Sequence, residues 1–425
     1  MSLRRGGGLH GSEGLPVVAD ATGCTLHVFG GSSTPYQALH HLLWLSEEAW
    51  RVDKQPRLFD ARSPEMRTGP LAPRPVRHRY ARLASIVGYA STEFFHFLFE
   101  SLPRLALLLP ALEADSRLYL VVPATTSQLS RAVGFVARLL RLVLPGAWFD
   151  AQRVIGYADE GAAPGERLAA EEAMVWADWQ GVQAADGSPT HCLTPRRALQ
   201  AAAALVADAR HATQEGPGGA AKHATSMAHG QSEEGGDAVA RPSSQDKLSQ
   251  IKSNQAKPEE AAGTAGRPYL IYAARRGVSM RALGETDEVA LLAILQRVAA
   301  ANSLLLHVFD GAEMLIEEAI DLFASATIVV GVHGGALSNI LFCRPGAMLL
   351  ELSVQSSVAR HYEHAAVALG LRYASVPLAA DQRGVAAANV SLPEGGLAAV
   401  EAALAAAFAG EHTSKGDGSV IHDEV

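Results

Sequence analysis

The sequence predicts an α/β protein with two Rossmann-like domains that face each other across a cleft. Short apolar runs alternate with helical segments in both halves of the chain, a pattern typical of parallel strands covered by helices on both faces. With 48% hydrophobic residues, the 425-residue chain can fill two cores. A polar segment without Phe, Trp or Tyr, residues 211–266, separates the two halves.

The domain boundaries follow from this composition. Residues 211–266 consist mainly of Ala, Gly, Ser, Gln, Glu and Lys, and such a segment cannot bury enough apolar surface to offset the entropy lost on ordering. We therefore expect a disordered low-complexity insert there. The predicted order is a partly irregular N-terminal region, a first Rossmann-like domain, the insert, a second Rossmann-like domain and a loose tail: 1–84, 85–210, 211–266, 267–409 and 410–425.

The first domain is expected to contain strands at 118–123 and 153–157 and helices at 128–144 and 194–210. The run LYLVVP at 118–123 is continuously apolar, as in a strand covered on both faces. The Ala-rich helix at 194–210 begins with a threonine and a proline, which is a usual start signal.

The second domain repeats this alternation more clearly. Its predicted strands are 268–274, 303–309, 327–332, 348–353 and 373–378. Its predicted helices are 285–301, 317–324, 357–369 and 396–408. Ligands bind at the carboxyl ends of the strands in such a sheet.

Charge and cysteine content exclude several classes of protein. The net charge of −8 leaves no basic excess to follow a nucleic-acid backbone. Cys24, Cys192 and Cys343 are odd in number and form no CxxC pair, so we expect buried thiols rather than a disulfide scaffold or a structural zinc site. No run reaches the ~20 apolar residues of a membrane span, and the N-terminal residues lack the apolar core of a signal peptide.

The strongest local motif is a buried strand, 327–332, that runs into His333, Gly334 and Gly335 and then into a helix. Such a turn presents backbone N–H groups and a positive helix end to an anion. We expect a phosphate-type site to which His333 and Asn339 add polar contacts. A glycine turn with a satisfied histidine is the alternative. The turn itself is neither a GxGxxG nor a P-loop, which argues against hydride transfer and ATP hydrolysis at this site.

A second motif lies in the apolar segment 90–112, where His96, Glu100 and Arg104 recur four residues apart on one helix face. Pro103 is expected to break or kink the helix just before Arg104. A histidine beside a glutamate can act as a general base with its orienting carboxylate. An ordinary pair on a solvated helix face fits the pattern as well.

A third group of charged residues is expected at the same sheet edge as the glycine turn. Arg275 and Arg276 follow a strand and Arg281 lies in the next loop, where arginines can clamp a diphosphate. Glu351 ends a strand, where a carboxylate can accept ribose hydroxyls. A solvated basic loop and a charge-paired glutamate are the alternatives.

Three segments together resemble glycosyltransferase family 61: FFHFLFESLPRL (94–105), RRGVSMRALGETDEV (275–289) and FASATIVVGVHGGALSNILFCRPGAMLLEL (323–352). The resemblance covers roughly 85–408 apart from the insert. It implies a GT-B architecture and inverting transfer of a sugar from a nucleotide donor to a glycan or glycoprotein hydroxyl. It also implies no bound metal or cofactor, which agrees with the lack of any Asp-x-Asp in the chain.

The interpretation as an inverting glycosyltransferase gives these residues roles. The first domain would hold the acceptor, with His96 as the base and Glu100 as its orienting group, and the second would hold the nucleotide sugar. The implied donor-binding residues are Arg275, Arg276, Arg281, His333, Gly334, Gly335, Asn339 and Glu351. The implied location is the Golgi or another secretory compartment, although the sequence shows no signal peptide or membrane span, so a cytosolic protein or a truncated sequence is the alternative.

The chain departs from the family pattern at three places. It has HGGALSN where the pattern usually reads HGAGLTN, Gly284 where an asparagine commonly precedes the acidic pair, and Ala319 where a glutamine is frequent. Two alternatives to transferase activity therefore stay open. One is a catalytically silent member that binds a glycan or a partner, and the other is a different group transfer on the same fold, such as polysaccharide pyruvyl transfer.

Overall fold

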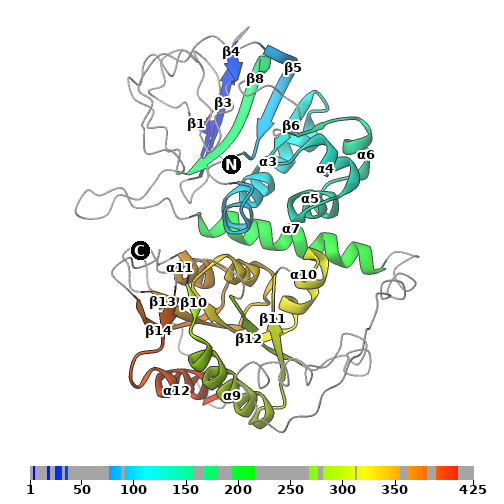
Figure 1. The fold of residues 1–425 in the computed structure, drawn as a ribbon. Coiled ribbons are helices and arrows are strands. Elements are labelled where there is room, and N and C mark those ends of the chain that lie inside the picture. Colours follow the sequence, from blue (N-terminus) through cyan, green and yellow to red (C-terminus); the bar gives the residue numbers. More distant parts are fainter. Residues whose placement is uncertain are drawn as a thin grey trace, which may run out of the picture. The chain divides into compact units, whose positions relative to one another are not determined.

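The computed structural model describes residues 3–4, 17–19, 24–30, 34–36, 76–87, 91–156, 167–179, 194–215, 268–275, 281–311, 314–354, 361–380 and 389–409. The chain divides into two compact units, one of residues 1–226 with 315–317 and the other of residues 227–314 with 318–425. Each unit has its own β-sheet (Figure 1). Both units are therefore mixed α/β, as the sequence predicts.

The sheet of the first unit has the order β1-β2-β3-β8-β5-β6-β7, with β4 also paired to β8. Its strands are β1 (Leu3–Arg4), β2 (Val17–Ala19), β3 (Cys24–Gly30), β4 (Thr34–Tyr36), β5 (Val76–Ser85), β6 (Leu118–Val122), β7 (Val154–Gly156) and β8 (Arg167–Trp179). Strands β8, β5, β6 and β7 are parallel, whereas β1 to β4 join antiparallel. This antiparallel half differs from the parallel sheet expected of a Rossmann-like domain.

The helical run from Phe94 to Ala114 is continuous. It consists of α2 (Phe94–His96), the π-helix η1 (Phe97–Ser101) and α3 (Leu102–Ala114). The break expected at Pro103 does not occur, because Pro103 lies in the first turn of α3 after a π-helical turn, where the missing N–H removes no needed hydrogen bond. By length and composition this run alone, among the described residues, could cross a membrane, and more than half of it is buried inside the protein, as in a core helix.

The helix expected at 128–144 is two helices, α4 (Thr126–Arg131) and α5 (Phe135–Val143). The chain turns between them through Ala132 and Gly134, which have positive φ angles of 52° and 81°. Thr125 starts α4 with a capping box, in which its hydroxyl accepts from the Gln128 backbone N–H at 3.0 Å.

Two further helices complete the first unit, α6 (Gly146–Asp150) and α7 (Arg196–Glu215). Helix α7 continues five residues into the segment expected to be disordered, so 211–215 are helical. Residues 216–266 lie outside the described residues. The expectation of a disordered insert therefore concerns that part alone.

The sheet of the second unit has the order β10-β15-β14-β13-β12-β9-β11. Its strands are β9 (Tyr269–Ala273), β10 (Ala282–Leu283), β11 (Leu305–Phe309), β12 (Ala326–Val332), β13 (Met348–Val354), β14 (Arg372–Ala380) and β15 (Asn389–Ser391). The five strands predicted from the sequence are confirmed, and they form a parallel group in the order β11-β9-β12-β13-β14. The order of connection reverses between β9 and β12, and ligands bind at such a switch point in parallel sheets.

The helices of this unit are α9 (Glu285–Ala301), α10 (Ile316–Ala324), α11 (His361–Ala368) and α12 (Gly396–Ala409). Figure 1 shows α9 and α12 on one side of the sheet and α10 and α11 on the other. The helix expected after the glycine turn is a 3-10 helix, η4 (Gly335–Phe342), whose tight pattern begins with the hydrogen bond from the Leu337 N–H to the Gly334 carbonyl.

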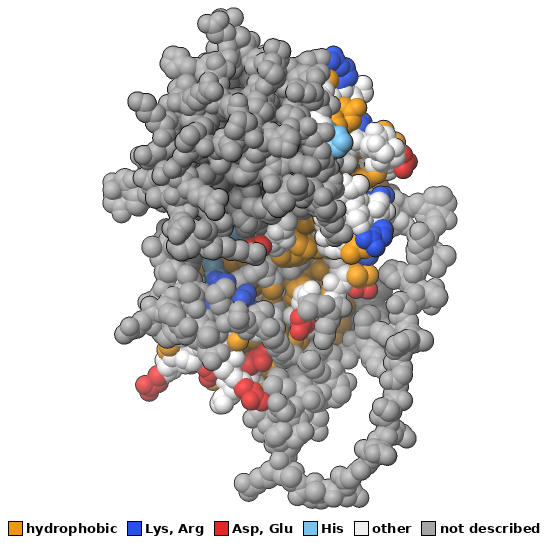
Figure 2. Space-filling view, turned by 45° about the horizontal axis from the view of Figure 1, so that its top comes forward, with side chains coloured by type: hydrophobic (Ala, Val, Ile, Leu, Met, Phe, Trp, Pro, Cys, Tyr) orange, Lys and Arg blue, Asp and Glu red, His pale blue; other side chains and the backbone are white. Residues whose placement is uncertain are grey.

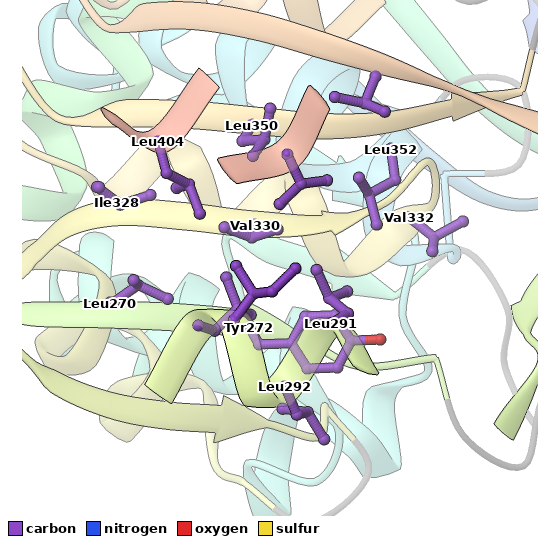
Figure 3. Packing of buried hydrophobic residues seen from close by; sticks show 14 of the residues in the cluster. Leu270, Tyr272, Leu291, Leu292, Ile328, Val330, Val332, Leu350, Leu352 and Leu404 are labelled. Carbon is purple, nitrogen blue, oxygen red and sulfur yellow. The ribbon is translucent and has the colours of Figure 1, made fainter. Parts of the chain in front are cut away.

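One hydrophobic core of the second unit lies between the sheet and helices α9 and α12. Alternate strand residues such as Leu270, Val330 and Leu350 pack there with Leu291 and Leu404 (Figure 3). Successive side chains of a strand point to opposite faces of the sheet. The strand residues that alternate with these core residues therefore point to the face away from α9 and α12. That face carries the polar groups of the candidate site.

Candidate functional site

The candidate site lies at the carboxyl ends of β9 and β12. The two strands pair in parallel with Ala273 beside Gly331, so Arg275 and His333 both follow at the same sheet edge. The structure therefore brings together two residues that the sequence places in separate motifs. This edge is the switch point of the sheet, where a ligand is expected.

The guanidinium of Arg275 lies directly against Gly334. A Cβ atom added to Gly334 would be 1.6 Å from Arg275 Nη1 and 2.6 Å from Arg275 Cζ. The φ angle of Gly334 is 163°, which any residue can adopt, so the glycine is needed for space and not for its backbone conformation. At Gly335, by contrast, no atom lies within 4 Å of an added Cβ.

A second arginine lies close to the first. Burial lowers the pKa of Arg275, and the positive charge of Arg281 lowers it further. Arg281 has a left-handed backbone, with φ of 58°, a conformation that costs a non-glycine residue about 1–3 kcal/mol. Its buried Nε has no hydrogen-bond partner. Two positive charges held together in spite of backbone strain are typical of a site that receives an anion. Arg276 lies outside the described residues.

His333, at the start of the glycine turn, is hydrogen-bonded to the buried carboxylate of Glu351. His333 Nδ1 lies 2.5 Å from Glu351 Oε1, and the Tyr373 hydroxyl donates to Glu351 Oε2 at 2.7 Å. The Glu351 side chain has no exposed surface. Both of its oxygens are hydrogen-bonded. The direct ribose contact expected from the sequence therefore has no exposed oxygen to make it in this structure.

Tyr362 holds the glycine turn in place through contacts with the Gly334 carbonyl and the His333 ring. Its hydroxyl donates to the Gly334 carbonyl at 2.7 Å, and its ring meets the His333 ring edge-on with centroids 5.2 Å apart. Burial raises the pKa of Tyr362, so the phenol keeps the proton that it donates. Because C=O and N–H point in opposite directions across a trans peptide, the Gly335 N–H points away from Tyr362. Nothing in the motif itself indicates Tyr362 or Tyr373.

Asn339 lies inside the protein. Its Nδ2 donates to the Ala336 carbonyl at 2.8 Å, which braces η4, and its Oδ1 is buried without a hydrogen-bond partner. The residue has no exposed surface. A contact between Asn339 and a donor stays a prediction, and in this conformation the amide can affect the site only through the turn.

In the first unit, the predicted pair of His96 and Glu100 is formed. His96 Nδ1 lies 3.0 Å from Glu100 Oε1, and the two side chains are 21% and 25% exposed. Arg104 differs from the expectation of a solvated face, because only 6% of it is exposed. The pair is accessible and oriented, as a general base requires, and its role stays a prediction.

The family model of glycosyltransferase 61 matches residues 94–350. The chain belongs to glycosyltransferase family 61. The match runs from the helix that carries His96 to the strand that carries Glu351, and membership of family 61 implies glycosyltransferase activity. None of the curated proteins compared with the chain matches it.

Two departures from the family 61 pattern lie at the start of α9 and within α10. Gly284 is the N-cap of α9 and makes no side-chain cap, and glycine in place of asparagine there costs only a few tenths of a kcal/mol, roughly. Ala319 is 3% exposed within α10. Neither residue is among the groups described above around Arg275 and His333 in this family 61 member.

The described residues contain no group of three or more His, Cys, Asp or Glu placed to hold a metal ion. Of the three cysteines, Cys343 is free and buried, and burial raises its pKa to about 12. The side chains of Cys24 and Cys192 lie outside the described residues. Basic side chains on the described part of the surface in Figure 2 stand in separate small groups rather than in one stripe.

Proposed function

We propose that this family 61 member is an inverting, metal-independent glycosyltransferase. It moves a sugar from a nucleotide-sugar donor to a hydroxyl of a glycan or glycoprotein, in a GT-B arrangement, within the Golgi or another secretory compartment. The observation that supports this proposal best is the convergence of Arg275, Arg281 and the His333 turn at the switch point of the second sheet.

The donor site follows from the charge that develops during the reaction. The nucleoside diphosphate leaves with added negative charge, and preorganised donors aimed at that charge lower the barrier most. The guanidinium groups of Arg275 and Arg281 carry two positive charges, and Arg276 is expected to add a third. The first N–H groups of η4 have no partner within the helix, so the glycine turn adds neutral donors. These groups take the part that a metal ion plays in other transferases.

The acceptor side needs a base. As the sugar is displaced, the acceptor hydroxyl must lose its proton. His96 is the proposed base, and its Nδ1 is held by Glu100 at 3.0 Å. Because His96 and Arg275 lie in different units, the proposal assigns the acceptor to one unit and the donor to the other.

A thermal-shift screen with nucleotide sugars tests the donor site. One donor or its nucleoside diphosphate should raise the melting temperature, because a ligand that binds the folded state stabilises it by mass action. Arg275→Ala should abolish this shift. The matched control is Arg297→Ala, which removes an exposed arginine that pairs with Glu401 on the surface of the same unit. A screen in which no nucleotide shifts the melting temperature, or in which Arg275→Ala keeps the full shift, would contradict the proposal.

A further inference from the structure

A chain of four hydrogen-bonded side chains runs under the sheet edge that carries the site. Glu351 in β13 lies beside Ser375 in β14 in the strand register, and Tyr373 is two residues earlier on the same face of β14. The Ser375 hydroxyl bonds to Tyr373, Tyr373 donates to Glu351 at 2.7 Å, and Glu351 meets His333 at 2.5 Å. The chain ends at the imidazole ring of the glycine turn.

The direction of these hydrogen bonds depends on the charge of Glu351. An ionised carboxylate can only accept hydrogen bonds, and a fully buried carboxylate is costly unless donors surround it. Glu351 has no exposed surface. With Glu351 ionised, the two groups bonded to its oxygens, His333 Nδ1 and the Tyr373 hydroxyl, both carry protons.

Tyr373 keeps its proton because it is buried beside negatively charged carboxylates. Burial raises its pKa most, and the negative charges of Glu351 and Glu363 raise it further, against a smaller opposite effect of the hydrogen bond from Ser375. The phenol is thus a permanent donor to Glu351 Oε2. It leaves Oε1 for the ring of His333.

We propose that Glu351 and Tyr373 are positioning residues that fix His333 in the tautomer with the proton on Nδ1 and offer Nε2 to the ligand. In this tautomer Nε2 is an acceptor. It therefore meets a hydroxyl of the donor, on the ribose or the sugar, and leaves the phosphate oxygens to Arg275 and Arg281. This inference rests on the proposed donor site, but the state of the ring can be measured without a donor.

The test is a two-bond 1H–15N correlation spectrum of the full chain labelled with 15N-histidine, with His333→Gln to assign the resonance. We expect His333 to show the Nδ1–H tautomer near neutral pH. Tyr373→Phe removes one hydroxyl from the chain of hydrogen-bonded side chains and should move the His333 resonances toward a mixture of the two tautomers. Tyr269→Phe removes the same atom at the amino end of β9 and should leave them unchanged. Glu351→Gln, if folded, should also release the tautomer.

Three results would overturn the inference: an Nε2–H tautomer, protons on both ring nitrogens, or an unchanged His333 signal in Tyr373→Phe. Binding of inorganic pyrophosphate separates this outcome from failure of the proposed function. Pyrophosphate should bind the wild type and Tyr373→Phe equally, because both keep Arg275 and Arg281. No binding to the wild type would contradict the anion site and leave the tautomer result standing, whereas weaker binding to Tyr373→Phe would place His333 on the phosphate and overturn the inference.

Discussion

Two histidine–glutamate pairs use the same atoms in different surroundings. In each pair a glutamate oxygen meets the Nδ1 of a histidine, at 3.0 Å for His96 and Glu100 and at 2.5 Å for His333 and Glu351. The first pair is local, four residues apart on one helical run, and both side chains reach solvent. The second joins the turn after β12 to strand β13, and its carboxylate is fully buried.

The difference shows how surroundings set the role of a pair. A partly exposed pair at i,i+4 adds only about 0.2–0.5 kcal/mol to helix stability, so a change in its protonation costs the fold little. A buried carboxylate is tied to the stability of its unit, because removal of one partner leaves the other unsatisfied. The exposed pair is suited to proton transfer and the buried pair to holding a ring in place.

The largest expected effect is on stability. Glu351→Ala leaves His333 and Tyr373 without their shared acceptor and should lower the free energy of unfolding by about 3–5 kcal/mol. Glu100→Ala should lower it by no more than about 0.5 kcal/mol. Urea denaturation of the two variants measures both values. Equal losses would show that burial does not distinguish the pairs.

The next effect is on turnover. His96→Ala should lower kcat by ~10²-fold or more with little change in donor affinity, because a base matters in the transition state. Steady-state kinetics with the donor found by thermal shift measures this. If His96→Ala is folded and fully active while Glu100→Ala is inactive, the glutamate is the base. Normal turnover in both variants would place the acceptor site elsewhere.

A smaller effect, on donor binding, should distinguish Gly334 from Gly335 in the glycine turn. Gly334→Ala would displace the Arg275 guanidinium and weaken donor binding by about tenfold, the loss expected of one hydrogen bond to a charged group. Gly335→Ala has open space around the added methyl group and should bind the donor as the wild type does. Calorimetric titration compares the variants. Equal affinities would mean that Arg275 does not need its place against Gly334.

The smallest effect is expected from chelation. Excess chelator should leave turnover unchanged, because the arginines and backbone amides are proposed to neutralise the leaving diphosphate. Activity measured before and after dialysis against chelator decides this. Loss of turnover that manganese restores would point to a metal site in place of these cations.

The sequence predicts local features of the molecule well. Helix α9 has the bounds expected from its pattern, 285–301, and the pair of His96 and Glu100 follows from their spacing on a helix. The glycine turn lies where a buried strand ends, so its place at the sheet edge also follows from the sequence. Each of these features depends on residues that are close together in the chain.

Features that depend on distant strands could not be predicted in this way. Tyr373 reaches Glu351 only through the register of β13 and β14, and no local pattern encodes that register. Strand β8 is rich in Ala and Glu, which favour helices, and it forms a strand because β3 and β5 pair along it. The turn at Ala132 adopts a left-handed conformation that its residue type does not signal.

The two tyrosines below the glycine turn also give the site an optical reporter. Tyrosinate absorbs in the ultraviolet at longer wavelength than tyrosine, and burial raises the pKa of both Tyr362 and Tyr373. In an alkaline titration these two of the nine tyrosines should ionise late, when the strands and helix around them open. The delayed absorbance step would report the integrity of the glycine turn without any substrate, label or assay of sugar transfer.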